Sequence, residues 1–89
     1  MGNLFNVNII SPLKVLYSGK ISSLIAPAST GYLGVLANHA PMVATLASGK
    51  IIIREPGGER KVIPYEGKGV LQVLKNEVTL ILDYIKPAA

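Results

Sequence analysis

The side chains able to do acid, base or ligand chemistry are few in this chain and scattered along it. His39 is the only histidine, and cysteine is absent, so neither a disulfide nor a thiolate metal site can form. A single histidine without acidic sequence neighbours indicates a structural corner or a contact residue rather than a general base. The five acids lie mostly in expected turns or at strand ends, where solvated charge is the usual state: Glu55, Glu59, Glu66, Glu77 and Asp83.

Gly67-Lys68-Gly69 superficially resembles a phosphate-binding loop. The GxxxxGK[ST] spacing is missing and no helix is expected after it, so we interpret it as a strand start with a bulge. Four tyrosines and one phenylalanine, not clustered, are too few for a platform that stacks nucleic-acid bases. We therefore expect no catalytic residue, no cofactor and no metal site.

The chain has the size of one domain, residues 1–89, and is unusually apolar. Apolar residues make up 49% before its nine glycines are counted, whereas a typical 45–50% already includes glycine. Part of this surplus must lie on the surface of so small a domain, and exposed apolar patches usually mark a partner. The net charge of +4 is dispersed, with only Arg60-Lys61 adjacent. A solvated surface is favoured, and a small basic β-barrel that binds nucleic acid or another anion is the alternative.

Neither a membrane span nor a targeting segment is expected. The longest uncharged stretch is interrupted by glycine, proline and polar residues, whereas a spanning helix needs about 20 mostly apolar residues. Met1-Gly2-Asn3 directly precedes a strand, which leaves no room for a signal peptide. Asn6 breaks the myristoylation pattern.

Alternating and β-branched segments predict an all-β fold. No segment has helical periodicity over ten or more residues, and turn signals recur every six to twelve residues, which is typical of a sandwich or flattened barrel. Proline at position 64 indicates an edge strand or a bulge. The expected strands cover residues 4–10, 15–17, 20–26, 32–36, 42–46, 50–54, 59–65, 68–74 and 77–83, with a loop at 27–31 and a tail at 85–89.

Two turns and one hairpin are specific enough to test. Pro56-Gly57-Gly58 and Lys75-Asn76 predict hairpin turns, the second because asparagine tolerates positive φ. In the last hairpin both faces are apolar. Val78, Leu80 and Leu82 occupy one face, and Leu71, Val73 and Ile81 are expected on the other. The second face then lies either in the interior at a crossing or under another chain.

The run from position 31 to 46, GYLGVLANHAPMVATL, contains no charged residue and organises the rest of the chain. Gly31 and Gly34 permit backbone geometry closed to other residues, and Pro41 keeps Ala40 out of the helical region. Asn38-His39 forms the corner between two short apolar segments.

This corner carries a family resemblance. The pattern Gly31-x-Leu33-Gly34-Val35-x-x-Asn38-His39-Ala40-Pro41-Met42-Val43 resembles the signature of the ε subunit of F-type ATP synthases, whose mitochondrial equivalent is named δ. Further matching pieces are Val7-x-Ile9-Ile10-Ser11-Pro12, Tyr17-Ser18-Gly19, Gly49-Lys50-Ile51 and the strand Gly69-x-Leu71-x-Val73 before Asn76. The resemblance implies a ten-stranded flattened β-sandwich. It also implies a non-catalytic rotor subunit that docks the foot of the γ subunit onto the c-ring.

The resemblance assigns two contact sets. The γ-facing set is Ser11, His39, Ala40, Met42 and Ala44, and the c-ring set is Ser29, Thr30, Gly31 and Tyr32. Many family members carry acids in the ring loop, where this chain has Thr30 and Tyr32. We therefore expect hydrogen bonding and tyrosine packing there. Asn38 stands where many members have glycine, and asparagine can adopt the same left-handed backbone.

Longer members of the family continue into a two-helix C-terminal domain that inhibits ATP hydrolysis. This chain stops at Ala89, so we expect no C-terminal helical hairpin and a short, non-inhibitory coupling subunit. A chain cut at the domain boundary would have the same sequence, and the gene's stop codon decides between the two. The implied location is the cytoplasmic face of a bacterial plasma membrane, as a peripheral subunit, or the equivalent plastid face, with protons or sodium as the coupling ion.

Overall fold

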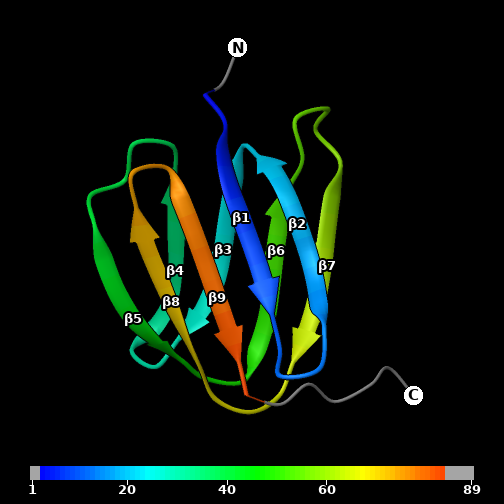
Figure 1. Ribbon diagram of the computed structural model, residues 1–89, viewed down its shortest axis with the longest axis vertical. Helices are drawn as coiled ribbons and strands as arrows, with labels where there is room; N and C mark the ends of the chain where they lie inside the picture. Colours follow the sequence, from blue (N-terminus) through cyan, green and yellow to red (C-terminus); the bar gives the residue numbers. More distant parts are fainter. Residues whose placement is uncertain (1–2, 84–89) are drawn as a thin grey trace.

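The computed structural model describes residues 3–83, and every element in that range is a β-strand (Figure 1). The strands are β1 (Phe5–Ile10), β2 (Val15–Ile21), β3 (Ser23–Ala28), β4 (Gly31–Leu36), β5 (Met42–Leu46), β6 (Gly49–Arg54), β7 (Arg60–Tyr65), β8 (Gly69–Leu74) and β9 (Glu77–Leu82). The predicted all-β class is confirmed, with nine strands in the described part rather than the ten that the resemblance implies. Residues 3–83 hold no helix of the length and apolarity needed to cross a membrane. The expected tail at 85–89 lies outside the described residues.

The strands form two layers (Figure 1). One layer has the order β2-β1-β9-β8-β5, and in the view of Figure 1 it lies in front of β4, β3, β6 and β7. We call these the front and back layers. The layers share one backbone bridge, Ala28 with Leu46, between β3 and β5. The predicted flattened sandwich is therefore confirmed, as a single sheet folded over on itself.

Side-chain alternation explains why the layers pack together. On β1, Phe5, Val7 and Ile9 are buried while the residues between them are half-buried, which follows the alternation of these three apolar residues with Asn6 and Asn8 in the sequence. The inward residues of both layers meet in one apolar core, and none of the buried side chains there is charged. Such a core is typical of two sheets packed face to face.

Two predicted strands have wrong boundaries. The second strand does not end at Tyr17. It continues through Ser18 and Gly19 to Ile21 because these residues pair with β1, and the Ser18 hydroxyl lies 2.7 Å from Asn8 Oδ1. The third strand begins at Ser23 and runs through Pro27 and Ala28, which the sequence assigned to a loop. Pro27 is tolerated because β3 changes neighbour there, from β6 to β5, so no ladder bond is required of its missing N–H.

The predicted turns are confirmed. The β6–β7 hairpin closes through Gly58, which has a φ of 92°, and Lys75 and Asn76 form the β8–β9 turn with φ of 50° and 60°. Pro64 lies on an edge of the described sheet, since β7 pairs there with β6 alone and without a register shift. The bulge proposed at positions 67–69 is wrong. Gly67 precedes the strand, and β8 keeps an unbroken register with both of its neighbours.

The assignment of faces in the last hairpin needs correction. Leu71 pairs with Leu80 and Val73 with Val78, and residues paired in this way share a face. All four are buried in the core. The outward face keeps Ile81, which is 50% exposed, and its partner Val70. The expected second apolar face is thus narrower than the sequence indicates.

The backbone of β9 and the ring of Tyr65 lie so close to Gly69 that a side chain at this position would clash with them. A Cβ at position 69 would lie 2.6 Å from the Ile81 carbonyl oxygen and 2.9 Å from the hydroxyl of Tyr65. The Tyr65 side chain is buried, and its hydroxyl has no hydrogen-bond partner among the described residues. Gly69 is therefore the residue that leaves space for this ring.

Gly69→Ala should destabilise the fold by about 1–3 kcal/mol, because backbone and a buried ring must both shift. Gly34→Ala is the matched control, since a Cβ there meets nothing within 4 Å and the position has no positive φ. Urea unfolding measures both variants. Equal midpoints for the two would show that the space beside Tyr65 is not constrained.

A side-chain bridge spans the two strands that end the sheet, β2 and β7. The Tyr17 hydroxyl donates to Glu55 Oε2 at 2.6 Å, and Lys61 Nζ lies 3.7 Å from the same oxygen. The Lys61 ammonium also lies 5.8 Å from the centre of the Tyr17 ring. Burial, with the hydrogen bond and the charge of Glu55, raises the pKa of Tyr17 to about 12.

This shift predicts a loss of stability at alkaline pH. Because the pKa of Tyr17 in the folded chain lies above the ordinary value of 10, the stabilisation is complete below pH 10 and is lost as the pH rises toward 12. Burial, with the charge of Asp83, raises the pKa of Tyr65 to about 12 as well, so Tyr17→Phe should remove only part of the decline. Urea midpoints at pH 8, 10 and 11 compare the variant with the unmodified chain, so that alkaline effects common to both chains cancel. Identical declines would contradict the bridge.

Candidate functional site

The corner between β4 and β5 carries His39 and Ala40 of the predicted γ-facing set. Asn38 has a φ of 65°, the left-handed conformation expected from the sequence. His39 Nδ1 lies 2.7 Å from the Ala40 carbonyl oxygen. Because a carbonyl only accepts, Nδ1 donates in this contact. The corner therefore presents the imidazole of His39, held to the corner's own backbone, and the exposed Ala40.

Met42 and Ala44 follow on β5, but they face inward. They pair with Val73 and Leu71, both buried, and Met42 packs partly against the core. Val43 lies between them on the outward face and is 70% exposed. The outward residue of β5 nearest the corner is thus one that the sequence did not assign to a contact set.

Ser11 lies at the other end of the molecule from His39. Its Oγ accepts from the backbone N–H of Lys14 at 3.3 Å, and its own N–H donates to the Lys14 carbonyl at 2.9 Å. These bonds shape the turn after β1, whereas the corner adjoins the start of β1 through Asn76, which accepts from Asn6 N–H. The length of β1, about 20 Å at 3.3 Å per residue, separates the two ends. The structure does not bring Ser11 and His39 together.

The outward face of the front layer joins these two ends. Asn8 and Thr79 are paired across β1 and β9, and Gln72 lies opposite Thr79 on β8. One step toward Ser11, the paired residues are apolar: Ile10, Ile81 and Val70. A surface that is polar at mid-strand and apolar near the Ser11 end thus runs across β1, β9 and β8.

The predicted ring set is brought together in the β3–β4 turn at the Ser11 end. Ser29 is held to β5, with its N–H donating to the Thr45 carbonyl at 2.9 Å and its Oγ 2.9 Å from Thr45 Oγ1. The Tyr32 hydroxyl accepts from Lys50 N–H at 3.2 Å, while the side chain stays 61% exposed. Thr30 is exposed at the tip, and Gly31 has a φ of 131° that favours glycine.

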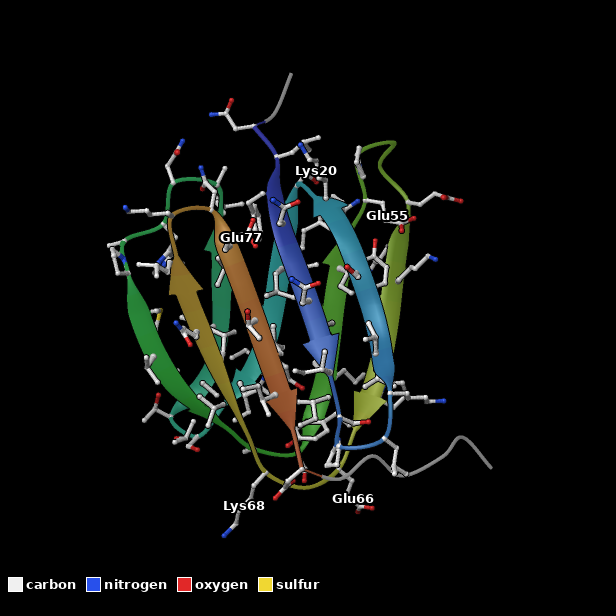
Figure 2. The ribbon with its side chains drawn as sticks, viewed as in Figure 1. Lys20, Glu55, Glu66, Lys68 and Glu77 are labelled. Atoms are coloured by element: carbon white, nitrogen blue, oxygen red, sulfur yellow. The ribbon has the colours of Figure 1, made fainter. Side chains whose placement is uncertain are left out.

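A hollow of about 490 Å³ lies beside this turn. Its lining combines hydroxyl-bearing, small and basic residues: Ser29, Thr45, Leu46, Ala47, Ser48, Gly67, Lys68 and Gly69. Figure 2 shows Lys68 and Glu66 at this end of the sandwich, with Lys20 and Glu55 at the opposite end. The hollow is thus a feature of the end that holds the predicted ring set.

The described residues hold no cluster of side chains suited to a metal ion, since no group of three or more His, Asp or Glu side chains in residues 3–83 could hold one. The backbone donors at positions 67–68 are already used, because Gly67 N–H donates to Ser48 Oγ and Lys68 N–H to Asp83 Oδ1. A phosphate loop needs such donors free, so the interpretation of this segment as a strand start is supported.

Sequence reasoning missed one interaction at the corner. The side-chain amide of Asn76 accepts from the backbone N–H of Asn38 and donates to the Asn38 side-chain oxygen, although the two residues are 38 positions apart. Each was recognisable as a candidate for positive φ, but no local pattern signals that two distant turns meet.

Comparisons with known proteins identify the family. A family model described as the β-sandwich domain of the ATP synthase delta/epsilon chain matches residues 4–88. An ATP synthase epsilon chain of Leptospira interrogans is 44% identical over 82 residues, which are 92% of this chain and 63% of that protein. An epsilon chain of Dichelobacter nodosus is 36% identical over the full 89 residues and 62% of its own length. This chain therefore spans about three fifths of the length of these relatives.

Solved structures agree on the fold. A chain in the Euglena gracilis mitochondrial ATP synthase (OSCP/F1/c-ring) superposes with a TM-score of 0.85 at 20% identity, over 97% of this chain and 56% of that chain. A chain in the central stalk/c-ring structure of the Tetrahymena thermophila mitochondrial ATP synthase gives a TM-score of 0.75 at 16% identity, over 96% of this chain and 67% of that chain. Because the family model matches nearly every residue and the predicted sandwich is present, the chain belongs to the β-sandwich domain family of the ATP synthase delta/epsilon chain.

Proposed function

We propose that the chain is a non-catalytic part of the central stalk of an F-type ATP synthase, where it helps the γ subunit and the c-ring rotate as one body. The observation that carries this proposal is the family match over residues 4–88. The titles of the two similar structures name a c-ring, and one names the central stalk. The alternative, a basic β-barrel for nucleic acid or another anion, gains no support from these matches.

The geometry favours two separate contact regions. A γ subunit that touches both Ser11 and His39 must lie along the outward face of the front layer, because these residues mark its two ends. That face includes the exposed Val43 and Ile81, which supply apolar contact area. The c-ring would meet the Ser29–Thr30 turn and the ring of Tyr32.

We further propose that the chain works in a membrane-bound complex, on the cytoplasmic face of a bacterial plasma membrane or the equivalent plastid face, without spanning the membrane itself. Contact with the c-ring explains this location, because loops of the ring reach the membrane surface. The proposed contacts of this domain are the same whether protons or sodium ions drive the complex.

Charge at the γ-facing surface should weaken binding. His39→Asp and Val43→Lys should each cost about 1–3 kcal/mol of affinity for γ, since each puts an ionised group into an apolar contact. Met42→Lys is expected to weaken binding too, but Met42 packs on the core, so Val43 tests the surface with less effect on folding. Calorimetry with the γ subunit measures the change.

Val62→Lys is the matched control for these variants, because Val62 is a 40% exposed valine on β7 of the back layer. It should bind γ like the unmodified chain. Unchanged affinity for both His39→Asp and Val43→Lys would remove the front face from the proposed contact.

Disulfide cross-linking should locate the c-ring, since the chain has no cysteine of its own. Thr30→Cys should cross-link to cysteines placed in the polar loops of the ring within the assembled complex. Gly57→Cys, in the β6–β7 turn at the opposite end, should not, although a Cβ there meets nothing within 4 Å. Equal yields from the two positions would refute the assigned ring end.

A further inference from the structure

Two asparagines clasp the β4–β5 corner to the β8–β9 turn. Asn38 N–H donates to Asn76 Oδ1 at 2.6 Å, and Asn76 Nδ2 donates to Asn38 Oδ1 at 3.1 Å. The two bonds use both ends of the Asn76 amide, so rotation of that side chain would break them together. We call this pair of bonds the asparagine clasp.

The backbone around the clasp requires residues that tolerate positive φ. Asn38 and Asn76 have φ of 65° and 60°, and Lys75 has 50°. Glycine would satisfy the backbone at position 38 or 76 equally well, but it has no amide group to bond across the gap. Asparagine supplies the left-handed backbone and the cross-link in one residue.

Asn76 also reaches a third element. Its carbonyl oxygen accepts from Asn6 N–H at 2.9 Å, at the start of β1, and the Asn6 amide donates to Glu77 Oε2 at 2.6 Å. The corner is therefore tied to the part of the front layer where β1, β8 and β9 meet. No other hydrogen bond within residues 3–83 joins positions 37–41 to a different element.

We propose that Asn76 is a positioning residue that fixes His39 and Ala40 in the shape that the partner subunit meets. This inference rests on the proposed function, which places the corner in the γ contact. His39 follows Asn38 directly, and among the described residues its ring bonds only within the corner, to the Ala40 carbonyl. Without the clasp no hydrogen bond ties the corner to another element of residues 3–83, although Ala37 still packs against the core, and binding must then order the segment around His39.

Asn76→Gly tests the clasp without straining the turn, because glycine retains the positive φ and removes both bonds. Backbone amide exchange followed by NMR should show the Asn38 N–H exchanging at least about tenfold faster, while amides of the buried strand β6 keep their rates. Lys75→Gly is the matched control. It changes the neighbouring positive-φ residue, leaves the clasp intact, and should not alter exchange at Asn38.

Asn76→Asp tests the role of the amide more finely. Aspartate can still accept from Asn38 N–H but offers no hydrogen to Asn38 Oδ1, so exchange at Asn38 should lie between the unmodified chain and Asn76→Gly. If Asn38 exchanges equally fast in Asn76→Gly and Lys75→Gly, the clasp does not hold the corner and the inference is overturned.

Binding to the γ subunit completes the test. Asn76→Gly should raise the Kd by about three- to tenfold, and Lys75→Gly should leave it unchanged. Faster exchange with an unchanged Kd would mean that the clasp is only structural, which overturns the positioning role. If the unmodified chain itself fails to bind γ, the proposed function fails, whereas the exchange rates still decide whether the clasp exists.

Discussion

The burial of alternating side chains between two layers is the constraint on which the rest of the structure depends. Once Val7 and Ile9 of β1 and Leu71 and Val73 of β8 face inward, the residues that alternate with them along the same strands must face outward. A shift of one residue in any strand would exchange its two faces. The composition of the outer surface, and with it any partner contact, is therefore fixed by the core.

Strong local patterns predicted much of the fold. The alternation in β1, the glycines after Pro56 and the Lys75-Asn76 pair each specify their structure within a few residues, and the structure matches them. Within the uncharged run that begins at position 31, the sequence also predicted a corner at Asn38, and Asn38 has the positive φ of such a corner. In each case the signal lies within a few residues. It is either the alternation of apolar and polar residues that marks a strand, or a residue type that accepts the positive φ of a turn.

Features that depend on a distant partner could not be predicted. Ser18 and Gly19 look like a turn, yet they extend β2 because β1 lies alongside. Pro27 looks like a loop residue, yet it sits in β3 where the strand exchanges neighbours. Leu71 was assigned to the wrong face because its register with Leu80 is set by pairing across the hairpin.

The candidate site likewise has features that the sequence predicted and features that depend on distant residues. The family pattern located the corner and the ring turn as segments, but it did not reveal that Ser11 and His39 mark opposite ends of the front layer. Nor did it reveal that Met42 and Ala44 turn inward while Val43 turns out. The family resemblance identifies contact positions by their place in the sequence. Side chains alternate between the two faces of a strand, and this alternation decides which of those positions a partner can reach.

The proposed function requires that the front layer is the surface that meets the γ subunit. Amide exchange of the chain with and without the γ subunit tests this most directly. We predict slower exchange on γ binding at both ends of that layer, around Ser11 and around His39, with β7 of the back layer unchanged. Protection confined to β7, or to only one of the two ends, would contradict the account.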